Sequence, residues 1–179
     1  MVRRCMVIVA LLLTSGAVAA ATLNVPADYA TIQAAIDAAN PGDEIVIAAG
    51  TYEVAAPHIL PPGGLSFRGT GEVVLTGSTG AFFEVVDPQN LDLFRFENLR
   101  FTGNPVGIRT PVPVNPFPET RLEVENCAFV QNGVGISARN TGQFRLTNCR
   151  FEGGAIGVDL RFAWMLAADC VFIGPEVAI

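Results

Sequence analysis

Glu125-Asn126-Cys127-Ala128-Phe129 decides the fold of this chain, because its pattern returns along the whole second half of the sequence. Each copy reads as a polar turn former, an apolar residue, any residue and phenylalanine: Asn98-Leu99-Arg100-Phe101, Asn126-Cys127-Ala128-Phe129, Asn148-Cys149-Arg150-Phe151 and Asp169-Cys170-Val171-Phe172. A second echo begins six residues past each phenylalanine, at Gly107-Ile108, Gly135-Ile136, Gly157-Val158 and Ala178-Ile179. Repeats of about 20 to 45 residues indicate stacked units that bury a core only against their neighbours.

The spacing of the copies gives the length of one turn. Cys127 and Cys149 are 22 residues apart and Cys149 and Cys170 are 21 apart, whereas Leu99 and Cys127 are 28 apart. The longer unit contains a Pro-rich stretch, residues 110–120, which we expect to form an extended, semi-rigid loop inserted into one turn.

Residues 122–139 form the clearest unit and predict three short strands, at 122–125, 127–129 and 135–139. Asn126 suits the first corner, because asparagine tolerates left-handed backbone. Stacking such units about 4.8 Å apart places like positions in columns. We therefore expect an asparagine column that shares amide hydrogen bonds, an interior phenylalanine column and a buried column of three free thiols. For the cysteines, one disulfide with a leftover thiol is the less favoured alternative.

The N-terminal region differs from the repeats. Residues 1–21 have a basic start, a short apolar run and a small-residue end, the pattern of a secretory signal peptide. The remaining residues, 22–179, predict one β-helix domain with a cap at 22–42 and coils at 43–179. Apolar positions 32, 35, 36 and 39 predict a helix within 29–39, capped by Asp28 or Thr31. Strands are expected at 43–52, 64–69 and 72–77.

The first part of this domain carries a resemblance. It rests on Thr31-Ile32-Gln33-Ala34-Ala35-Ile36-Asp37-Ala38-Ala39, Pro41-Gly42-Asp43 and Gly50-Thr51-Tyr52. This run resembles the N-terminal cap and first coil of right-handed parallel β-helix proteins of the pectate-lyase-like (pectin lyase-like) superfamily. The resemblance implies an all-β solenoid with a short amphipathic capping helix. It leaves the activity open, because the same opening occurs in pectin methylesterases, lyases and non-catalytic surface proteins.

The charge of the chain limits its partners. The formal net charge is −6, the pI is about 4.7, and all eleven basic side chains are arginine. No basic stripe typical of a nucleic-acid site is visible. The apolar run near the N-terminus is too short to span a bilayer, so we expect no transmembrane segment in the mature chain.

The third strand of each unit is where the resemblance implies substrate binding, because the substrate of such enzymes crosses its outer face. With Ile136 and Ala138 pointing inward, alternate residues point out. One outward column then reads Glu84, Arg109, Ser137 and Asp159, and its neighbour reads Val86, Pro111, Arg139 and Arg161. Arginine forks suit carboxylates, so the substrate-binding candidates Arg109, Arg139, Asp159, Arg161, Ser137 and Glu84 indicate an acidic sugar.

The same columns limit the chemistry. Glu84 and Asp159 are expected about 14 Å apart, beyond the roughly 5 to 9.5 Å that paired glycosidase carboxylates require. A lyase would use Arg109 or Arg161 as its base, and it would need calcium held by several carboxylates. The sequence lacks such a cluster of carboxylates. The sole histidine, His58, has no nucleophilic side chain near it in the sequence, so no catalytic triad is indicated. No catalytic residue or metal ligand is therefore assigned.

Two functions stay open. The first is a secreted, periplasmic or cell-surface domain that binds, and as a polysaccharide lyase or other pectin-active enzyme would process, acidic polysaccharide. The second is a non-catalytic adhesin or structural repeat. Because Ile179 falls partway through a turn, we also expect either a truncated chain or end-to-end pairing at the open last rung.

Overall fold

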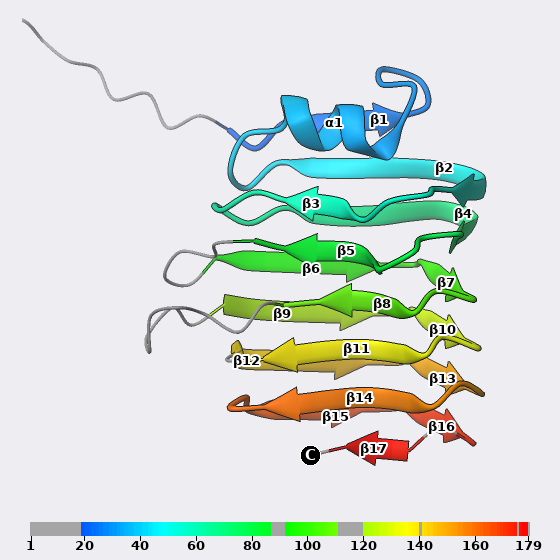
Figure 1. Cartoon of the computed structure of the whole chain (residues 1–179). Coiled ribbons are helices and arrows are strands. Elements are labelled where there is room, and N and C mark those ends of the chain that lie inside the picture. Colours follow the sequence, from blue (N-terminus) through cyan, green and yellow to red (C-terminus); the bar gives the residue numbers. More distant parts are fainter. Residues whose placement is uncertain (1–18, 87–91, 111–119, 140, 175, 179) are drawn as a thin grey trace, which may run out of the picture.

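The computed structural model describes residues 19–86, 92–110, 120–139, 141–174 and 176–178. These residues form an all-β parallel solenoid of about six turns with a single short helix (Figure 1). Most of the expected signal peptide, and the Pro-rich loop apart from its two end residues, lie outside the described residues. The elements are β1 (Thr22–Val25), α1 (Ile32–Ala38), β2 (Glu44–Glu53), β3 (His58–Leu60), β4 (Ser66–Thr76), β5 (Ala81–Val85), β6 (Leu93–Glu97), β7 (Arg100–Thr102), β8 (Val106–Arg109), β9 (Thr120–Glu125), β10 (Ala128–Val130), β11 (Val134–Arg139), β12 (Thr141–Thr147), β13 (Arg150–Glu152), β14 (Ile156–Arg161), β15 (Met165–Ala168), β16 (Val171–Ile173) and β17 (Glu176–Ala178).

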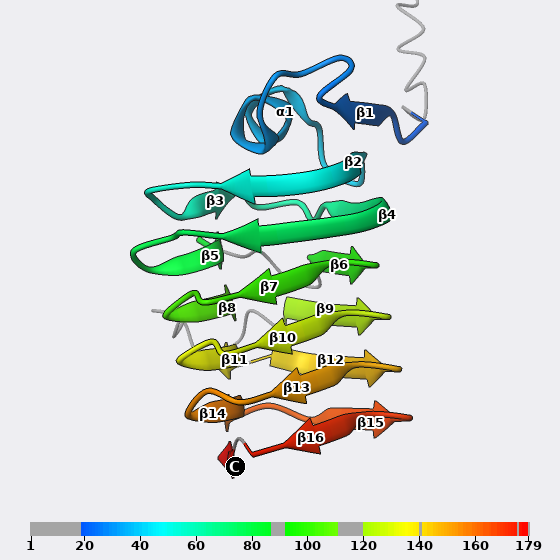
Figure 2. The same cartoon turned by 90° about the vertical axis from the view of Figure 1, so that its right-hand side faces the viewer.

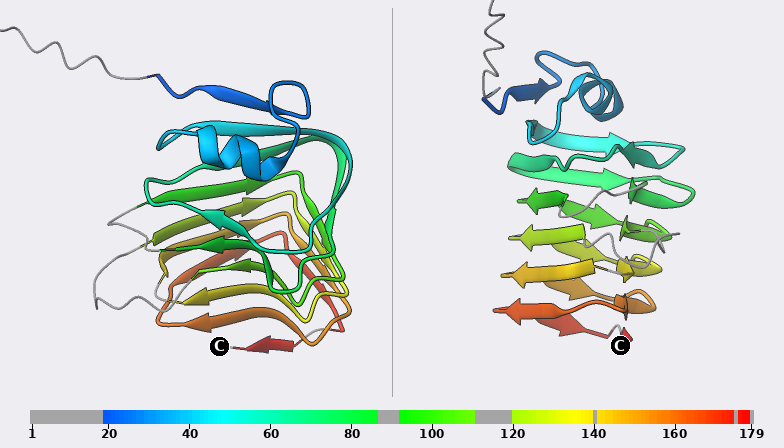
Figure 3. Two further views of the ribbon diagram at one scale, coloured as in Figure 1. Left: turned by 45° about the horizontal axis from the view of Figure 1, so that its top comes forward. Right: turned by 90° about the vertical axis from the view of Figure 1, so that its left-hand side faces the viewer.

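Each later turn contributes three strands to three stacks. The stacks are β6-β9-β12-β15, β7-β10-β13-β16 and β5-β8-β11-β14-β17, all paired in parallel (Figures 2 and 3). The first two stacks join through β4, whose beginning pairs with β6 and whose end pairs with β7. The expected separate strands at 64–69 and 72–77 are therefore wrong, because β4 bends at Gly71 (φ 92°) without breaking.

The polar residue of each repeat forms the corner between the first two stacks. Asn98, Asn126, Asn148 and Asp169 all have φ between 51° and 55°, the left-handed conformation that asparagine and aspartate tolerate. Asn148 Nδ2 donates a hydrogen bond of 2.7 Å to Asn126 Oδ1, which confirms amide sharing in the column. Asn98 Nδ2 instead donates to Glu97 Oε1 at 3.4 Å.

The phenylalanine column is confirmed and forms the spine of the core. Phe101, Phe129, Phe151 and Phe172 stack with ring centroids 4.7 to 4.8 Å apart and planes within 6° of parallel. The first three rings are almost completely buried.

The stack of phenylalanine rings explains why glycine recurs six residues after the phenylalanine of a repeat. A methyl group on Gly107 or Gly135 would lie 2.9 Å from a phenylalanine ring of the next turn and 2.5 Å from a backbone carbonyl. Space therefore selects glycine at these positions. The last echo differs from the prediction by two residues: Val177, and not Ile179, pairs with Val158, and the register shifts between Ile156 and Val158.

The cysteine column is also confirmed. Cys127, Cys149 and Cys170 are free thiols, the first two buried and the third half-buried. Burial raises the pKa of the Cys149 thiol to about 11, and raises that of Cys127 further. Cys127 and Cys149 are therefore chemically quiet core residues.

Helix α1 lies with β1 at one end of the stack, next to β2 (Figure 1). Thr31 caps it by accepting a hydrogen bond of 3.1 Å from the Ala34 amide, so Thr31, and not Asp28, is the N-cap. The helix is shorter than the expected 29–39 and buries Ile32, Ala35 and Ile36, the face that the spacing predicts.

Candidate functional site

The outer face of β5, β8, β11 and β14 carries the predicted site residues in the predicted register. Glu84 pairs with Arg109, Arg109 with Ser137, and Ser137 with Asp159. Arg139 pairs with Arg161 in the neighbouring column. Pro111 of that column lies outside the described residues.

The arginines of this face meet two carboxylates. Arg109 Nη1 lies 3.7 Å from Glu84 Oε1. Arg139 Nη2 lies 3.4 Å from Asp159 Oδ2, and Arg161 Nε lies 3.7 Å from Asp159 Oδ1. Three cations against two anions leave a small positive excess on this face of an acidic chain. These separations are long for charge-assisted hydrogen bonds, which usually measure about 2.7 to 2.9 Å.

Asp159 is the centre of the cluster. Ser137 is only 6 % exposed, and its hydroxyl lies 3.4 Å from Asp159 Oδ2. The Nε atom of Arg139 is buried and has no hydrogen-bond partner among the described residues. These residues line one surface depression together with Arg109, Thr110, Val106 and Val134.

Thr110 fixes the backbone from which Arg139 projects. It is buried, and its hydroxyl accepts a hydrogen bond of 2.8 Å from the Arg139 amide. The same oxygen lies 3.2 Å from the Arg139 carbonyl and 3.2 Å from the Thr141 hydroxyl. The sequence predicts Thr110 only as the first residue of the inserted loop. Thr110 directly follows outward-facing Arg109 at the end of β8, so continuing the alternation places it inward, which is the signal that indicates its burial.

The geometry limits what this face can do chemically. Glu84 and Asp159 sit on β5 and β14, three strand steps apart, or about 14 Å. Among the described residues, no group of three or more histidine, cysteine, aspartate or glutamate side chains could hold a metal ion. What the face offers is a set of guanidinium donors around a shared carboxylate, an arrangement suited to binding anions.

His58 lies away from this face, beneath α1. Gln33 Oε1 accepts from the Ile59 amide, and it lies 3.1 Å from His58 Nδ1, so Nδ1 carries the proton. His58 Nε2 is buried against Phe82 and Phe83 without a hydrogen-bond partner among the described residues. This burial lowers the pKa of His58 to about 4 and keeps the imidazole neutral.

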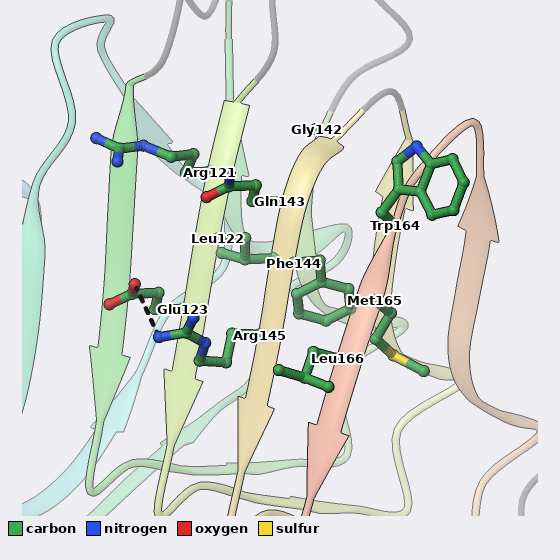
Figure 4. Close-up of a pocket in the computed structure, with 10 residues that line it drawn as sticks. All are labelled: Arg121, Leu122, Glu123, Gly142, Gln143, Phe144, Arg145, Trp164, Met165 and Leu166. Carbon is green, nitrogen blue, oxygen red and sulfur yellow. Dashed lines mark ion pairs between the residues drawn. The ribbon is translucent and has the colours of Figure 1, made fainter.

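A second surface groove, which the sequence did not reveal, lies over β9, β12 and β15. Figure 4 shows its outward side chains in two rows, with Arg121, Gln143 and Trp164 in one and Glu123, Arg145 and Leu166 in the other. Trp164 is 84 % exposed. The alternation of Gln143 and Arg145 around buried Phe144 was the available signal, but it does not say which neighbouring side chains form a groove.

No family model matches the chain, and comparison with curated proteins and with solved structures finds no match either. In the part of the chain that the structure describes, no helix is long and apolar enough to cross a membrane. The fold is accordingly identified at the level of a parallel β-solenoid, and any activity is a matter for proposal.

Proposed function

We propose that this chain is a secreted or cell-surface β-helix that binds acidic polysaccharide across β8, β11 and β14. The observation that carries the proposal is the cluster around Asp159, where Arg139 and Arg161 share one carboxylate and Arg109 stands one strand beyond Ser137. The carboxylates of a polyuronate would complete the hydrogen bonding of these guanidinium groups.

The availability of the arginines supports this ligand. The Arg161 side chain is 63 % exposed, and those of Arg109 and Arg139 are about one-third exposed. Exposed ion pairs are worth little, about 0 to 1 kcal/mol, so exchanging one for a ligand carboxylate costs little. Rows of such donors one strand apart suit a polymer with repeated charges.

The finer architecture belongs to the same proposal. We propose that the solenoid is right-handed and of the pectin lyase-like kind, and that α1 caps its first turn. The spacing of the repeats, the amphipathic α1 and the resemblance carried by residues 31–52 support this architecture, and the signal-peptide pattern of residues 1–21 supports export.

Binding can be tested by isothermal titration with polygalacturonate, using Arg109→Gln/Arg161→Gln as the variant. Each lost charge-assisted hydrogen bond is worth about 1.5 to 3 kcal/mol, so we expect affinity to fall at least about tenfold. Arg150→Gln is the matched control, because it removes a half-exposed arginine from β13, where Arg150 is paired with Glu152. No binding by the unmodified protein, or equal binding by the double variant, would refute the proposal.

The alternative is a non-catalytic adhesin or structural repeat domain. It is favoured by the ion pairs on the outer face, where all three arginines already have carboxylate partners. Incubation with pectate or alginate separates the two readings. Accumulation of unsaturated product absorbing in the ultraviolet would identify a lyase and exclude the alternative.

A further inference from the structure

We infer that the groove over β9, β12 and β15 is a second carbohydrate site, which takes an acidic oligosaccharide with one sugar ring against Trp164. The site uses the same ligand class as the proposed function but none of its residues, so either can fail alone.

The first argument is the exposure of Trp164. Its ring is 84 % exposed, on the same side of the sheet as Gln143 and one row from Leu166. A flat indole offers an apolar face together with one N–H donor. A sugar ring matches this surface, since it has an apolar face of C–H groups and a rim of hydroxyls.

The second argument is charge. In the row that crosses the groove, Glu123 lies between Arg95 on one neighbouring strand and Arg145 on the other. Arg95 holds that carboxylate at 2.6 Å, while Arg145 lies 4.0 Å from it. Arg145 is 62 % exposed and can therefore turn to a ligand anion at little cost. In a chain of net charge −6, this exposed guanidinium group favours an anionic partner at the groove.

The third argument is spacing. Arg145 on β12 pairs with Leu166 on β15, and Trp164 lies two residues before Leu166, so Arg145 and Trp164 are diagonal neighbours, about 7 to 8 Å apart. Figure 4 shows the Gln143 amide between Arg121 and Trp164, with two donors and one acceptor available to hydroxyl groups. A ring on Trp164 thus brings the acidic group of an adjoining sugar toward Arg145.

Trp164 is the single tryptophan of the chain, so its fluorescence reports on this groove. We expect a saturable change in emission when the intact protein is titrated with a hexamer of galacturonic acid. A neutral glucose hexamer should bind at least tenfold more weakly. Arg145→Gln should weaken the response to the acidic hexamer about tenfold, because it removes a charge-assisted hydrogen bond, whereas Arg150→Gln should leave it unchanged.

Two variants separate this site from the first one. A response that survives in Arg109→Gln and weakens in Arg145→Gln supports the inference. A response that weakens in Arg109→Gln and survives in Arg145→Gln assigns the ligand to the β8, β11 and β14 face, and overturns it. Calorimetric binding without any emission change also overturns it, as does an emission shift that depends on protein concentration alone, which would mean that a second copy covers Trp164.

Discussion

Gly135→Ala tests the idea that each phenylalanine ring packs against the glycine of the preceding turn. The backbone of Gly135 is not in the left-handed region, so any penalty comes from space and not from φ. The added methyl group would lie 2.5 Å from the Gly157 carbonyl oxygen and 2.9 Å from Cδ1 of Phe151. Both neighbours are held in the stack, the ring by the rings on either side of it.

The magnitude follows from these contacts. Forcing an extra methyl group into a close-packed core costs about 1 to 3 kcal/mol. Replacing glycine by alanine also raises the free energy of unfolding by about 0.4 to 1 kcal/mol, because the unfolded chain loses conformational freedom. We therefore expect the free energy of unfolding to fall by about 1 to 2 kcal/mol. For a chain of this size, that lowers the melting temperature by about 2 to 8 °C.

Urea unfolding followed by circular dichroism measures this change, with Gly157→Ala as a graded control. A methyl group on Gly157 is crowded by the Phe172 ring, at 3.0 and 3.1 Å, and makes an ordinary contact of 3.6 Å with Cβ of Phe151. Phe172 is only half-buried, so its ring can shift by a few tenths of an ångström. The cost of Gly157→Ala should be clearly smaller. If Gly135→Ala were as stable as the unmodified protein, the steric explanation of the repeat would be wrong.

Three further predictions concern the core and the region beneath α1. Because the pKa of buried His58 is about 4 in the folded chain and about 6.5 when unfolded, only the unfolded chain takes up this proton between those values. The contribution of neutral His58 to the free energy of unfolding is therefore full above pH 6.5, and it should fall by about 2 kcal/mol by pH 4.5. Urea unfolding at both pH values measures this loss, which should be absent in His58→Gln. Asn148→Ala should cost about 1 to 2 kcal/mol in the same assay, since it removes the bond to Asn126 and leaves alanine at φ 51°. Phe129→Ala should cost about 3 to 5 kcal/mol, whereas the same change at Phe162, which is 91 % exposed, should alter unfolding by less than about 0.5 kcal/mol.

The ladders could be predicted from sequence because stacking turns a period into contact. Once Cys127 and Cys149 are one turn apart, Asn126 must adjoin Asn148, and Phe129 must adjoin Phe151. The same logic placed Arg109, Ser137 and Asp159 in one column. No long-range pairing had to be guessed, since every strand meets the equivalent strand of the next turn.

Contacts that cross between columns were not predictable in this way. Asp159 bonds sideways to Arg139 as well as to Arg161, and Thr110 reaches both Arg139 and Thr141. Such contacts depend on side-chain rotamers and on where each turn ends. The register at Val177 differs from the prediction for a related reason, because irregularities in pairing shift the alignment, here by two residues between Phe151 and Val158, without changing the pattern of the sequence.

The parallel stacking of turns also determines where like charges lie next to one another on an outer face. Strand neighbours lie about 4.8 Å apart, and like charges directly opposite one another are destabilising. The columns mostly avoid this, since Glu84 is followed by Arg109, and Glu123 lies between Arg95 and Arg145. Glu97 and Glu125 break the rule on β6 and β9, and Arg139 and Arg161 break it on β11 and β14, where Asp159 is their shared carboxylate. An external carboxylate would lower the repulsion of the arginine pair but not that of the glutamate pair, which is the physical reason that the proposed polysaccharide site centres on Arg139 and Arg161.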